Sequence, residues 1–404
     1  MDLDLLYVLL VFGLFVVPRV LVRLRIPSAV TSLALGVAAA HVGWFEGDST
    51  IGLLSTFGIV ALFLSAGLEL DLAELRRGAL LLSVHLGLLI VGVALLAWAV
   101  TAWFDFGFRP AMIVALALLS PSTGFILDSL PGWDFTEKEA AWVRSMALAA
   151  ELLALAALFG VTQSTSSQTF LFSSLCLVGV IAAIPPVFRL FAAHIAPFAP
   201  RTEFAFLLMT AVVAAFVTRK LGVYYLVGAF LVGLAARRFR ERLPDLSSGR
   251  ILHAVEDFGM VFAPFYFFNA GLHIRLDQFG WHAFGIAGVL VLLLLPIRTF
   301  MVALLQRVFL REDLRHGARL GYATLPTLVF ALVLTQILRE SYTVPEALLG
   351  GIVLYTLVAT LIPGFLVART VGASPSEPGL SEPDRDGRNP VEDDAAEGGI
   401  GCRP

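Results

Sequence analysis

Long apolar segments alternate with short polar ones along most of this chain, and this pattern predicts membrane-spanning helices. Segments such as 51–68, 79–103 and 283–305 reach the ~20 residues that a helix needs to cross a bilayer. Thirteen spans are predicted in total, near residues 5–22, 26–44, 51–69, 78–104, 109–130, 139–162, 168–192, 202–219, 221–237, 254–273, 281–309, 315–338 and 346–369. We therefore expect an all-α, polytopic membrane protein.

Two broken segments reveal an internal repeat. Ser120-Pro121-Ser122-Thr123-Gly124 interrupts one span and Thr324-Leu325-Pro326-Thr327 interrupts another, with the prolines 205 residues apart. Ala66-Gly67-Leu68 recurs as Ala270-Gly271-Leu272, 204 residues further on. This offset pairs spans 1–6 with spans 8–13, and a displacement of seven spans inverts the second copy. Two inverted six-helix repeats with crossed broken helices are typical of secondary transporters.

Basic residues in the predicted loops give the orientation. Most of them lie on one side, and the positive-inside rule places that side in the cytoplasm. The opposite side carries only Arg109, Arg219, Lys220, Arg275 and Arg339. We therefore expect the N-terminus outside the cell and the C-terminus in the cytoplasm.

Composition narrows the possible functions. The chain is 58% hydrophobic and 15% charged, whereas a soluble domain carries ~25% charged residues. It has no glycine-rich phosphate loop, no metal-spaced Cys/His set and no basic nucleic-acid-binding stretch, so we expect neither an enzyme nor a cofactor, resident metal or nucleic-acid partner. Residues 371–404 are rich in Pro, Gly, Ser, Asp and Glu, and they predict a disordered cytoplasmic tail without a fused nucleotide-binding regulatory domain.

Glu151 is the first candidate for the site. Twelve residues of helix separate it from Glu139 in the preceding loop, which places it ~18 Å along the span and near the middle of a ~30 Å hydrocarbon core. A carboxylate at that depth is expensive and indicates function. Because burial disfavours the charged form, Glu151 can bind either a proton or a cation at one site. The alternative is a buried ion pair that only fixes helix packing.

Arg298 is the second candidate. It lies nine residues before Arg307, which places it ~14 Å from the cytoplasmic end of its span. Arginine stays protonated in proteins, so it suits a fixed countercharge better than a proton carrier. We expect Arg298 to pair with Glu151 when the cation leaves; the alternative is that it pairs with Asp128 or with carbonyls freed at the breaks.

The two breaks supply further candidates. Pro121, Gly124 and Pro326 interrupt the helices, and the hydroxyls of Ser122, Thr123 and Thr327 stand beside the interruptions. Hydroxyls, freed carbonyls and half-helix ends suit a cation, so these three residues are predicted to line the ion site. Ordinary proline kinks are the alternative. Asp128, after the first break, is a possible access-path residue, and His85 in the fourth span is a weaker candidate.

Several motifs together resemble the monovalent cation:proton antiporter superfamily, in particular its Kef-type or sodium/hydrogen exchanger membrane domain. Residues 57–71, Phe-Gly-Ile-Val-Ala-Leu-Phe-Leu-Ser-Ala-Gly-Leu-Glu-Leu-Asp, resemble the third-span signature. Residues 25–28, 228–233 and 263–271 look like three further signatures, and 115–123 resembles the unwound helix of the superfamily.

The resemblance covers roughly residues 3–370 and implies a homodimer that moves its core like an elevator. Residues 1–370 would form one transmembrane domain. Its scaffold would comprise about 1–77 and 200–275, and its core about 78–162 and 280–370.

The sequence departs from the superfamily's pattern at the site itself. The superfamily usually carries an aspartate preceded by Asn, Asp or Gln, where this chain has Ala150-Glu151. The basic residue that the superfamily carries in the eleventh span corresponds to Arg298. A Gly-Glu-Phe motif common in the Kef-type branch is absent, and Leu325-Pro-Thr-Leu-Val-Phe330 stands there instead. One acid with one permanent base suggests electroneutral exchange.

These observations favour an antiporter that exchanges protons for Na⁺ or K⁺ across a bacterial-type inner membrane. Three alternatives stay open at this point. They are an uncoupled K⁺ efflux protein, an organic-anion carrier in which Arg298 binds the substrate, and a transport-inactive sensor or scaffold indicated by the altered site.

Overall fold

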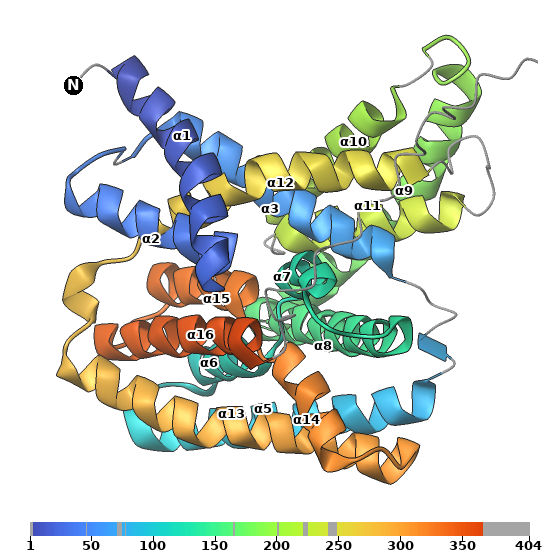
Figure 1. The fold of residues 1–404 in the computed structure, drawn as a ribbon. Coiled ribbons are helices and arrows are strands. Elements are labelled where there is room, and N and C mark those ends of the chain that lie inside the picture. Colours follow the sequence, from blue (N-terminus) through green and yellow to red (C-terminus); the bar gives the residue numbers. More distant parts are fainter. Residues whose placement is uncertain are drawn as a thin grey trace, which may run out of the picture. The chain divides into compact units, whose positions relative to one another are not determined.

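The computed structural model describes residues 3–45, 47–70, 75–76, 78–164, 166–199, 202–220, 225–240 and 249–366, in which the regular elements are helices (Figure 1). The predicted tail at 371–404 lies outside these residues. The α-helices are α1 (Leu3–Leu21), α2 (Ser28–His41), α3 (Ser49–Glu69), α5 (Ala79–Phe104), α6 (Phe108–Leu119), α7 (Thr123–Ser129), α8 (Glu137–Gln163), α9 (Ser167–His194), α10 (Glu203–Lys220), α11 (Tyr225–Arg240), α12 (Gly249–Leu272), α13 (Trp281–Leu310), α14 (Leu314–Ala323), α15 (Leu328–Ser341) and α16 (Glu346–Leu366).

Many of these helices are long enough to cross a bilayer. Within the described residues, nine candidate spans are sufficiently long and apolar, or ten if the pair α14 and α15, bent by 50°, is one span. The short α2 has 14 residues and α11 has 16. The structure thus supports an all-helical, polytopic fold, and the number thirteen stays a prediction.

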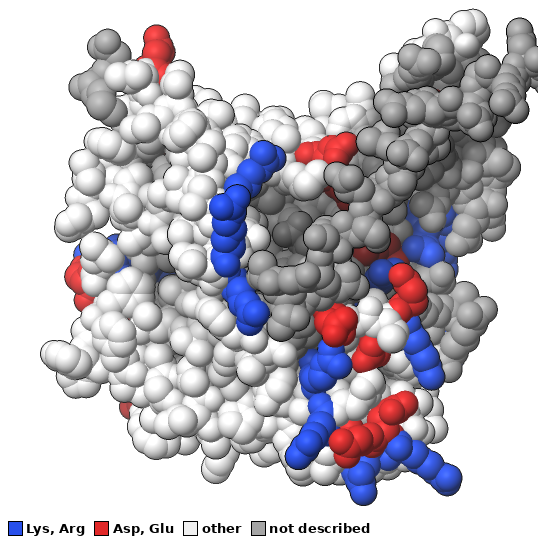
Figure 2. Space-filling view, in the orientation of Figure 1, with Lys and Arg blue, Asp and Glu red and all other residues white. Residues whose placement is uncertain are grey.

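The outer faces of these helices are apolar, as expected for contact with lipid. Large side chains such as Leu171 on α9 and Leu292 on α13 are 70% and 79% exposed. Figure 2 shows wide areas of one face without charged side chains; a strip of basic side chains lies over the region of α1, and charges of both signs gather near the C-terminal end of α13 and the start of α14. Soluble proteins rarely expose apolar surface on this scale, so this surface fits a bilayer.

Local sequence signals explain where several helices begin. Asp48 precedes α3, and its carboxylate accepts hydrogen bonds from the peptide N–H groups of Thr50 (2.8 Å) and Ile51 (3.2 Å). Before α8, Thr136 and Glu139 form a reciprocal capping box. Both caps satisfy N–H groups that a helix start leaves unpaired.

The helices pack in two groups (Figure 1). We call α1, α2, α3, α10, α11 and α12 the first bundle, in which α3 packs closely against α11 and α12. The second bundle comprises α5–α8 and α13–α16. Helix α9 contacts α8, α10 and α11, while α7 contacts α3 across the two groups. The site residues predicted from the sequence all belong to the second bundle.

Glycines bring helix backbones of the first bundle into contact. A Cβ atom on Gly67 of α3 would lie 2.3 Å from the carbonyl oxygen of Phe230 and 3.0 Å from the Cα of Gly233 on α11. A Cβ on Gly36 of α2 would lie 3.0 Å from the Cα of Gly271 on α12. The small-residue motifs noted in the sequence therefore mark two helix crossings where larger residues do not fit.

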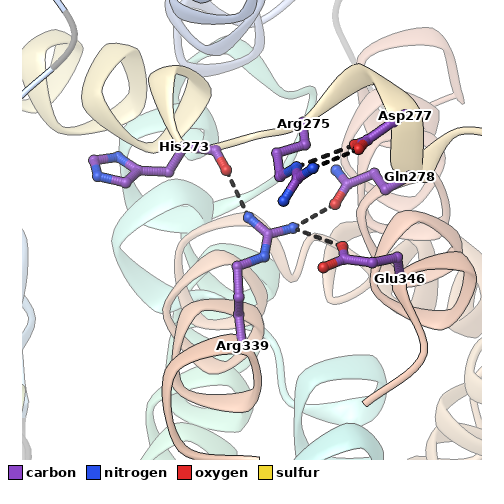
Figure 3. Close-up of polar contacts among 6 residues, drawn as sticks. All are labelled: His273, Arg275, Asp277, Gln278, Arg339 and Glu346. Carbon is purple, nitrogen blue, oxygen red and sulfur yellow. Dashed lines mark hydrogen bonds and ion pairs between the residues drawn. The ribbon is translucent and has the colours of Figure 1, made fainter. Parts of the chain in front are cut away.

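The connection between α12 and α13 is attached to the second bundle (Figure 3). Arg339, in the last turn of α15, donates to the carbonyl oxygen of His273 at 2.6 Å and to Oε1 of Gln278, and it lies 3.5 Å from Oε2 of Glu346. Gln278 also packs on α16, because a Cβ on Gly350 would lie 2.4 Å from its carbonyl oxygen. The connection thus lies fixed against α15 and α16.

We expect Gly67→Ala to destabilise the protein by about 1–3 kcal/mol, because the added methyl group forces the backbones of α3 and α11 apart. Thermal unfolding of the detergent-purified protein would show this as a lower Tm. Gly52→Ala on the same helix is the matched control, since nothing lies within 4 Å of a Cβ there. The control should leave the Tm unchanged or raise it slightly. Equal Tm values for the two variants would contradict the close crossing.

Candidate functional site

The two helix breaks meet inside the second bundle. Helix α6 ends at Leu119 and α7 begins at Thr123, while α14 ends at Ala323 and α15 begins at Leu328. The peptide N–H of Ser122 donates to the carbonyl oxygen of Pro326 at 2.8 Å, which joins one break directly to the other. We call residues 120–122 together with 324–327 the crossing. Pro121 and Pro326 help to create it, because proline has no N–H with which to continue a helix.

Arg298 occupies the carbonyl side of the crossing. Its Nη1 donates to the carbonyl oxygens of Leu118 (3.2 Å) and Leu325 (3.1 Å), and its Nη2 donates to that of Thr324 (2.9 Å). Tyr355 completes the arrangement, because its hydroxyl accepts from Nη1 at 3.1 Å and donates to Leu118 O at 3.2 Å. A permanent positive charge therefore lies at the C-terminal ends of α6 and α14, where helix dipoles favour a cation.

Glu151 lies at the N–H side of the first break. It is 2% exposed, and its Oε2 accepts a hydrogen bond from the peptide N–H of Thr123 at 3.0 Å. Thr123 is the first residue of α7, so the carboxylate satisfies an N–H that the break leaves without a helical partner. Glu151 thus binds a backbone N–H group at the crossing, whereas Arg298 binds backbone carbonyl groups there.

The predicted hydroxyl ligands differ in their surroundings. The side chains of Ser122 and Thr123 are buried, and the hydroxyl oxygen of Ser122 has no hydrogen-bond partner. Neighbouring Ser120 is buried without a partner in the same way. The hydroxyl of Thr327, also buried, donates to Thr356 Oγ1 at 3.4 Å. The hydroxyls of Ser120 and Ser122 thus have no protein partner, and the Thr123 hydroxyl interacts with the Glu151 carboxylate.

Two other predicted residues contribute little to this geometry. Gly124 lies in the first turn of α7, where a Cβ would lie 3.5 Å from the Cβ of Leu62 on α3. Asp128 belongs to α7, but its side chain lies outside the described part of the chain. Its proposed place on an access path is therefore left as a prediction.

The expected pairing of Arg298 with Glu151 is not the one seen in this structure. None of the ion pairs between described side chains joins these two residues, and Arg298 instead follows the alternative of binding freed carbonyls. The physical reason is that the two breaks present three carbonyl oxygens to one guanidinium group, whose planar set of donors can bind several oxygens at once.

Sequence reasoning missed Tyr355 and Thr356. Both lie on α16 in an otherwise apolar segment, and both are fully buried. A polar side chain inside a span needs a hydrogen-bond partner, so adjacent Tyr and Thr residues in such a segment are a usable signal. The sequence alone does not show that their partners are Arg298 and Thr327.

Comparisons with known proteins identify the family of this chain. The chain matches the family described as "Sodium/hydrogen exchanger, transmembrane" over residues 8–372. It is 23% identical over 361 residues to the probable Na⁺/H⁺ antiporter 3 of Methanocaldococcus jannaschii, covering 86% of this chain and 89% of that protein. It is 22% identical over 363 residues to a Na⁺/H⁺ antiporter of Enterococcus hirae, covering 84% and 90%.

A solved structure shares the fold. The sodium proton antiporter MjNhaP1 from Methanocaldococcus jannaschii, solved at pH 8, superposes with a TM-score of 0.67 at 15% identity. The match covers 91% of this chain and 96% of that chain. It therefore extends over both bundles.

We expect Arg298→Met to destabilise the protein by more than about 2 kcal/mol, because it leaves buried carbonyl oxygens without a donor. Arg298→Lys should cost less, since it keeps the charge but has fewer fixed donors. The Tm of purified protein measures both effects. Ile297→Met is the matched control, because this neighbouring side chain is 52% exposed on the outer face and should tolerate the change. A Tm for Arg298→Met equal to that of the control would show that the carbonyls find other partners.

Proposed function

Because this chain belongs to the transmembrane sodium/hydrogen exchanger family, we propose that it exchanges protons for a monovalent cation, Na⁺ or K⁺, across the cell's inner membrane. The observation that carries the proposal is the position of Glu151. This carboxylate is buried at the crossing, where it accepts a hydrogen bond from the peptide N–H of Thr123 and interacts with the Thr123 hydroxyl. A single carboxylate that binds either a proton or a cation makes the two compete, which is the minimum requirement for exchange.

The cation would lie among oxygen atoms next to Glu151. We assign Ser122, Thr123 and Thr327 as its ligands, together with carbonyls freed at the crossing. Such oxygens can replace the water shell of an alkali cation, as carbonyl rings do in ion channels. When a proton binds Glu151 instead, the cation leaves these hydroxyls. The peptide N–H of Thr123 then still donates to the Glu151 side chain.

Arg298 would act as a fixed countercharge. Its positive charge is held by the carbonyls at the ends of α6 and α14, so it does not depend on the charge of Glu151. One titrating acid with one permanent base gives one proton per monovalent cation, which is electroneutral exchange. An organic-anion carrier is disfavoured, because Arg298 already donates to four oxygen atoms of the protein.

We also propose the thirteen-span topology with inverted repeats, the N-terminus outside and the C-terminus in the cytoplasm. The glycine contacts support the repeat. Gly67 corresponds to Gly271 at the repeat offset of 204, and Ala34-Leu35-Gly36 in span 2 resembles Leu231-Val232-Gly233 in span 9 at an offset of 197. With these pairs, the contact of Gly36 with Gly271 is matched by that of Gly67 with Gly233. Exchanging the two repeats converts one contact into the other, which is what a twofold relation between them requires.

The mechanism proposed is an elevator movement in a homodimer. The first bundle, with its closely packed glycines, would be the scaffold, and the second bundle, with Glu151 and Arg298, would be the mobile core. The third-span signature favours the Kef-type branch of the superfamily.

We expect Glu151→Gln to abolish cation-dependent proton movement, because the amide can neither release a proton nor carry the charge that a cation needs. The assay uses proteoliposomes with an internal fluorescent pH dye, to which Na⁺, K⁺ or Li⁺ is added. Glu137→Gln is the matched control, since Glu137 lies on the same helix but is exposed in its first turn. The control should exchange at the wild-type rate. A wild-type protein that responds to none of the three cations would refute the proposed exchange.

A disulfide between the bundles tests the elevator movement. We expect the pair Leu62→Cys and Gly124→Cys, in a background without Cys176 and Cys402, to stop exchange when oxidised and to recover it when reduced. A Cβ atom on Gly124 would lie 3.5 Å from the Cβ of Leu62, a separation that a disulfide can bridge. Exchange by the reduced pair shows whether the substitutions themselves are tolerated.

A second cysteine pair within the first bundle provides the control. Ala61→Cys and Gly259→Cys join α3 to α12, and a Cβ on Gly259 would lie 3.9 Å from that of Ala61. Because both helices belong to the proposed scaffold, oxidation should leave exchange unchanged. Full exchange by the oxidised Leu62→Cys, Gly124→Cys protein would exclude a movement of the core past α3.

A further inference from the structure

A groove of about 70 Å³ enters the second bundle between α5 and α13, which lie side by side at its edge (Figure 1). Its mouth is formed by Leu88 on α5 and Ile297 on α13, which are 41% and 52% exposed on the outer face. Its inner end is formed by Leu119, the last residue of α6, and by Thr324 in the second break, each 8% exposed. We call it the side groove. It connects the outer apolar face of the bundle with the crossing.

The wall of the side groove offers little to water or to an ion. Most of the lining residues are apolar. The guanidinium of Arg298 already donates to four oxygen atoms, and the hydroxyl of Thr324 donates to the carbonyl oxygen of Gly321 at 2.9 Å. The unpartnered Nδ1 of His85 is itself buried, so it does not face the open volume. Apolar cavities stay dry even when they are large enough for water, and they take up apolar ligands instead.

The surface around the mouth is the surface that faces lipid. Leu292, on the same helix as Ile297, is 79% exposed, so hydrocarbon is the medium that meets the side groove. An empty groove would leave the side chains of its wall without van der Waals partners, and an apolar chain restores those contacts. The volume of about 70 Å³ is about half that of an engineered apolar cavity that binds benzene. It therefore accommodates a short length of hydrocarbon chain and not a whole lipid.

The depth of the side groove decides which part of a lipid can reach it. Gly92 lines the groove and lies 13 residues after Ala79, where α5 begins, and 12 before Phe104, where α5 ends. At 1.5 Å per residue the groove is ~18–20 Å from either end of the helix. This places it near the middle of a ~30 Å hydrocarbon core, where the ends of acyl chains meet. A headgroup stays out of reach at this depth.

We propose that the side groove binds the terminal part of a phospholipid acyl chain, which enters between α5 and α13 and packs against Leu119 and the crossing. The site recognises the hydrocarbon chain and its reach, and it does not recognise the headgroup. Pro121 of the first break also lines the groove, so the bound chain supports this break from the membrane side. The proposal goes beyond cation exchange and does not depend on it.

Photolabelling in proteoliposomes tests the site directly. Two phosphatidylcholine probes carry a diazirine either near the terminal methyl group of the acyl chain or near the glycerol, and mass spectrometry locates the labelled residues. Residues 113–119 of α6 are buried, so label on Leu119 reports the side groove and not the general lipid surface. We expect the terminal probe to label Leu119 several-fold more than the other probe does. Leu292 on the outer face should be labelled by the terminal probe as a positive control.

Filling the side groove from the protein should exclude the chain. A Cβ on Gly92 would lie 3.6 Å from Cδ1 of Leu119, an ordinary contact, so Gly92→Leu extends into the groove without a clash at its Cβ. We expect this variant to lose labelling of Leu119 several-fold and to keep that of Leu292. Gly87→Leu is the matched control on the same helix, because nothing lies within 4 Å of a Cβ there. It should be labelled like the wild type at both residues.

Thermal stability gives a second result. A ligand that binds only the folded state raises the Tm. Phosphatidylcholine added to the delipidated, detergent-purified protein should raise the Tm of the wild type and of Gly87→Leu equally, and that of Gly92→Leu by less. An equal rise in all three proteins would mean that lipid stabilises only through the general surface, and it would refute the support of the crossing.

The wild type alone can overturn the binding site, even if Gly92→Leu does not fold. Leu119 left unlabelled by the terminal probe while Leu292 is labelled would mean that the side groove is empty or holds water. Equal labelling of Leu119 by the two probes would contradict entry by the end of the chain. Neither photolabelling nor the Tm involves transport, so failure of this site and failure of the proposed exchange are distinguishable.

Discussion

A helix that breaks inside a bilayer leaves peptide groups without partners, and this protein breaks two helices at one place. Hydrocarbon offers no water to satisfy those peptide groups, so such a break persists only where protein groups, an ion or an internal cavity supply partners. Arg298 supplies donors for the carbonyls of Leu118, Thr324 and Leu325, and the two breaks bond to each other through Ser122 and Pro326. The need to satisfy these peptide groups explains the positions of Arg298 and Tyr355 and the contact between the two breaks.

The same requirement separates the two charges of the site. The carbonyl ends of the broken helices attract Arg298, whereas the freed N–H of Thr123 attracts Glu151. Each charge therefore has backbone partners of its own. A proton can bind to Glu151 or leave it while Arg298 keeps its hydrogen bonds. A direct salt bridge between them would instead tie the protonation of the acid to the release of the arginine. In the proposed exchange, this arrangement would make the arginine a constant background charge, against which a proton and a cation replace each other.

The sequence predicts positions along helices well and partners between helices less well. The two breaks followed from the prolines, and the burial of Glu151 followed from its place in a long apolar segment, because these properties belong to one segment. The recurring glycines marked helix contacts, but not that Gly67 meets Gly233. The sequence favoured Glu151 as the partner of Arg298, since opposite charges in a membrane usually pair. In the structure the partners of Arg298 are carbonyl oxygens, because the crossing brings several of them close together. Their closeness depends on the angles between helices, which no single segment determines. The contact between Tyr355 and Arg298 could not be predicted for the same reason.

The connection between α12 and α13 would limit the proposed movement of the two bundles relative to each other. Gln278 is bound to Arg339 and packs on Gly350, so it belongs mechanically to the second bundle. Helix α12 ends at Leu272 in the first bundle. In an elevator movement the backbone must therefore bend between Leu272 and Gln278. The bond from Arg339 to His273 O lies at the start of this short stretch, and it would break if the bend lay after His273. In the proposed elevator movement, Arg339 would therefore favour the arrangement seen here from outside the ion site, through its bond to His273 O.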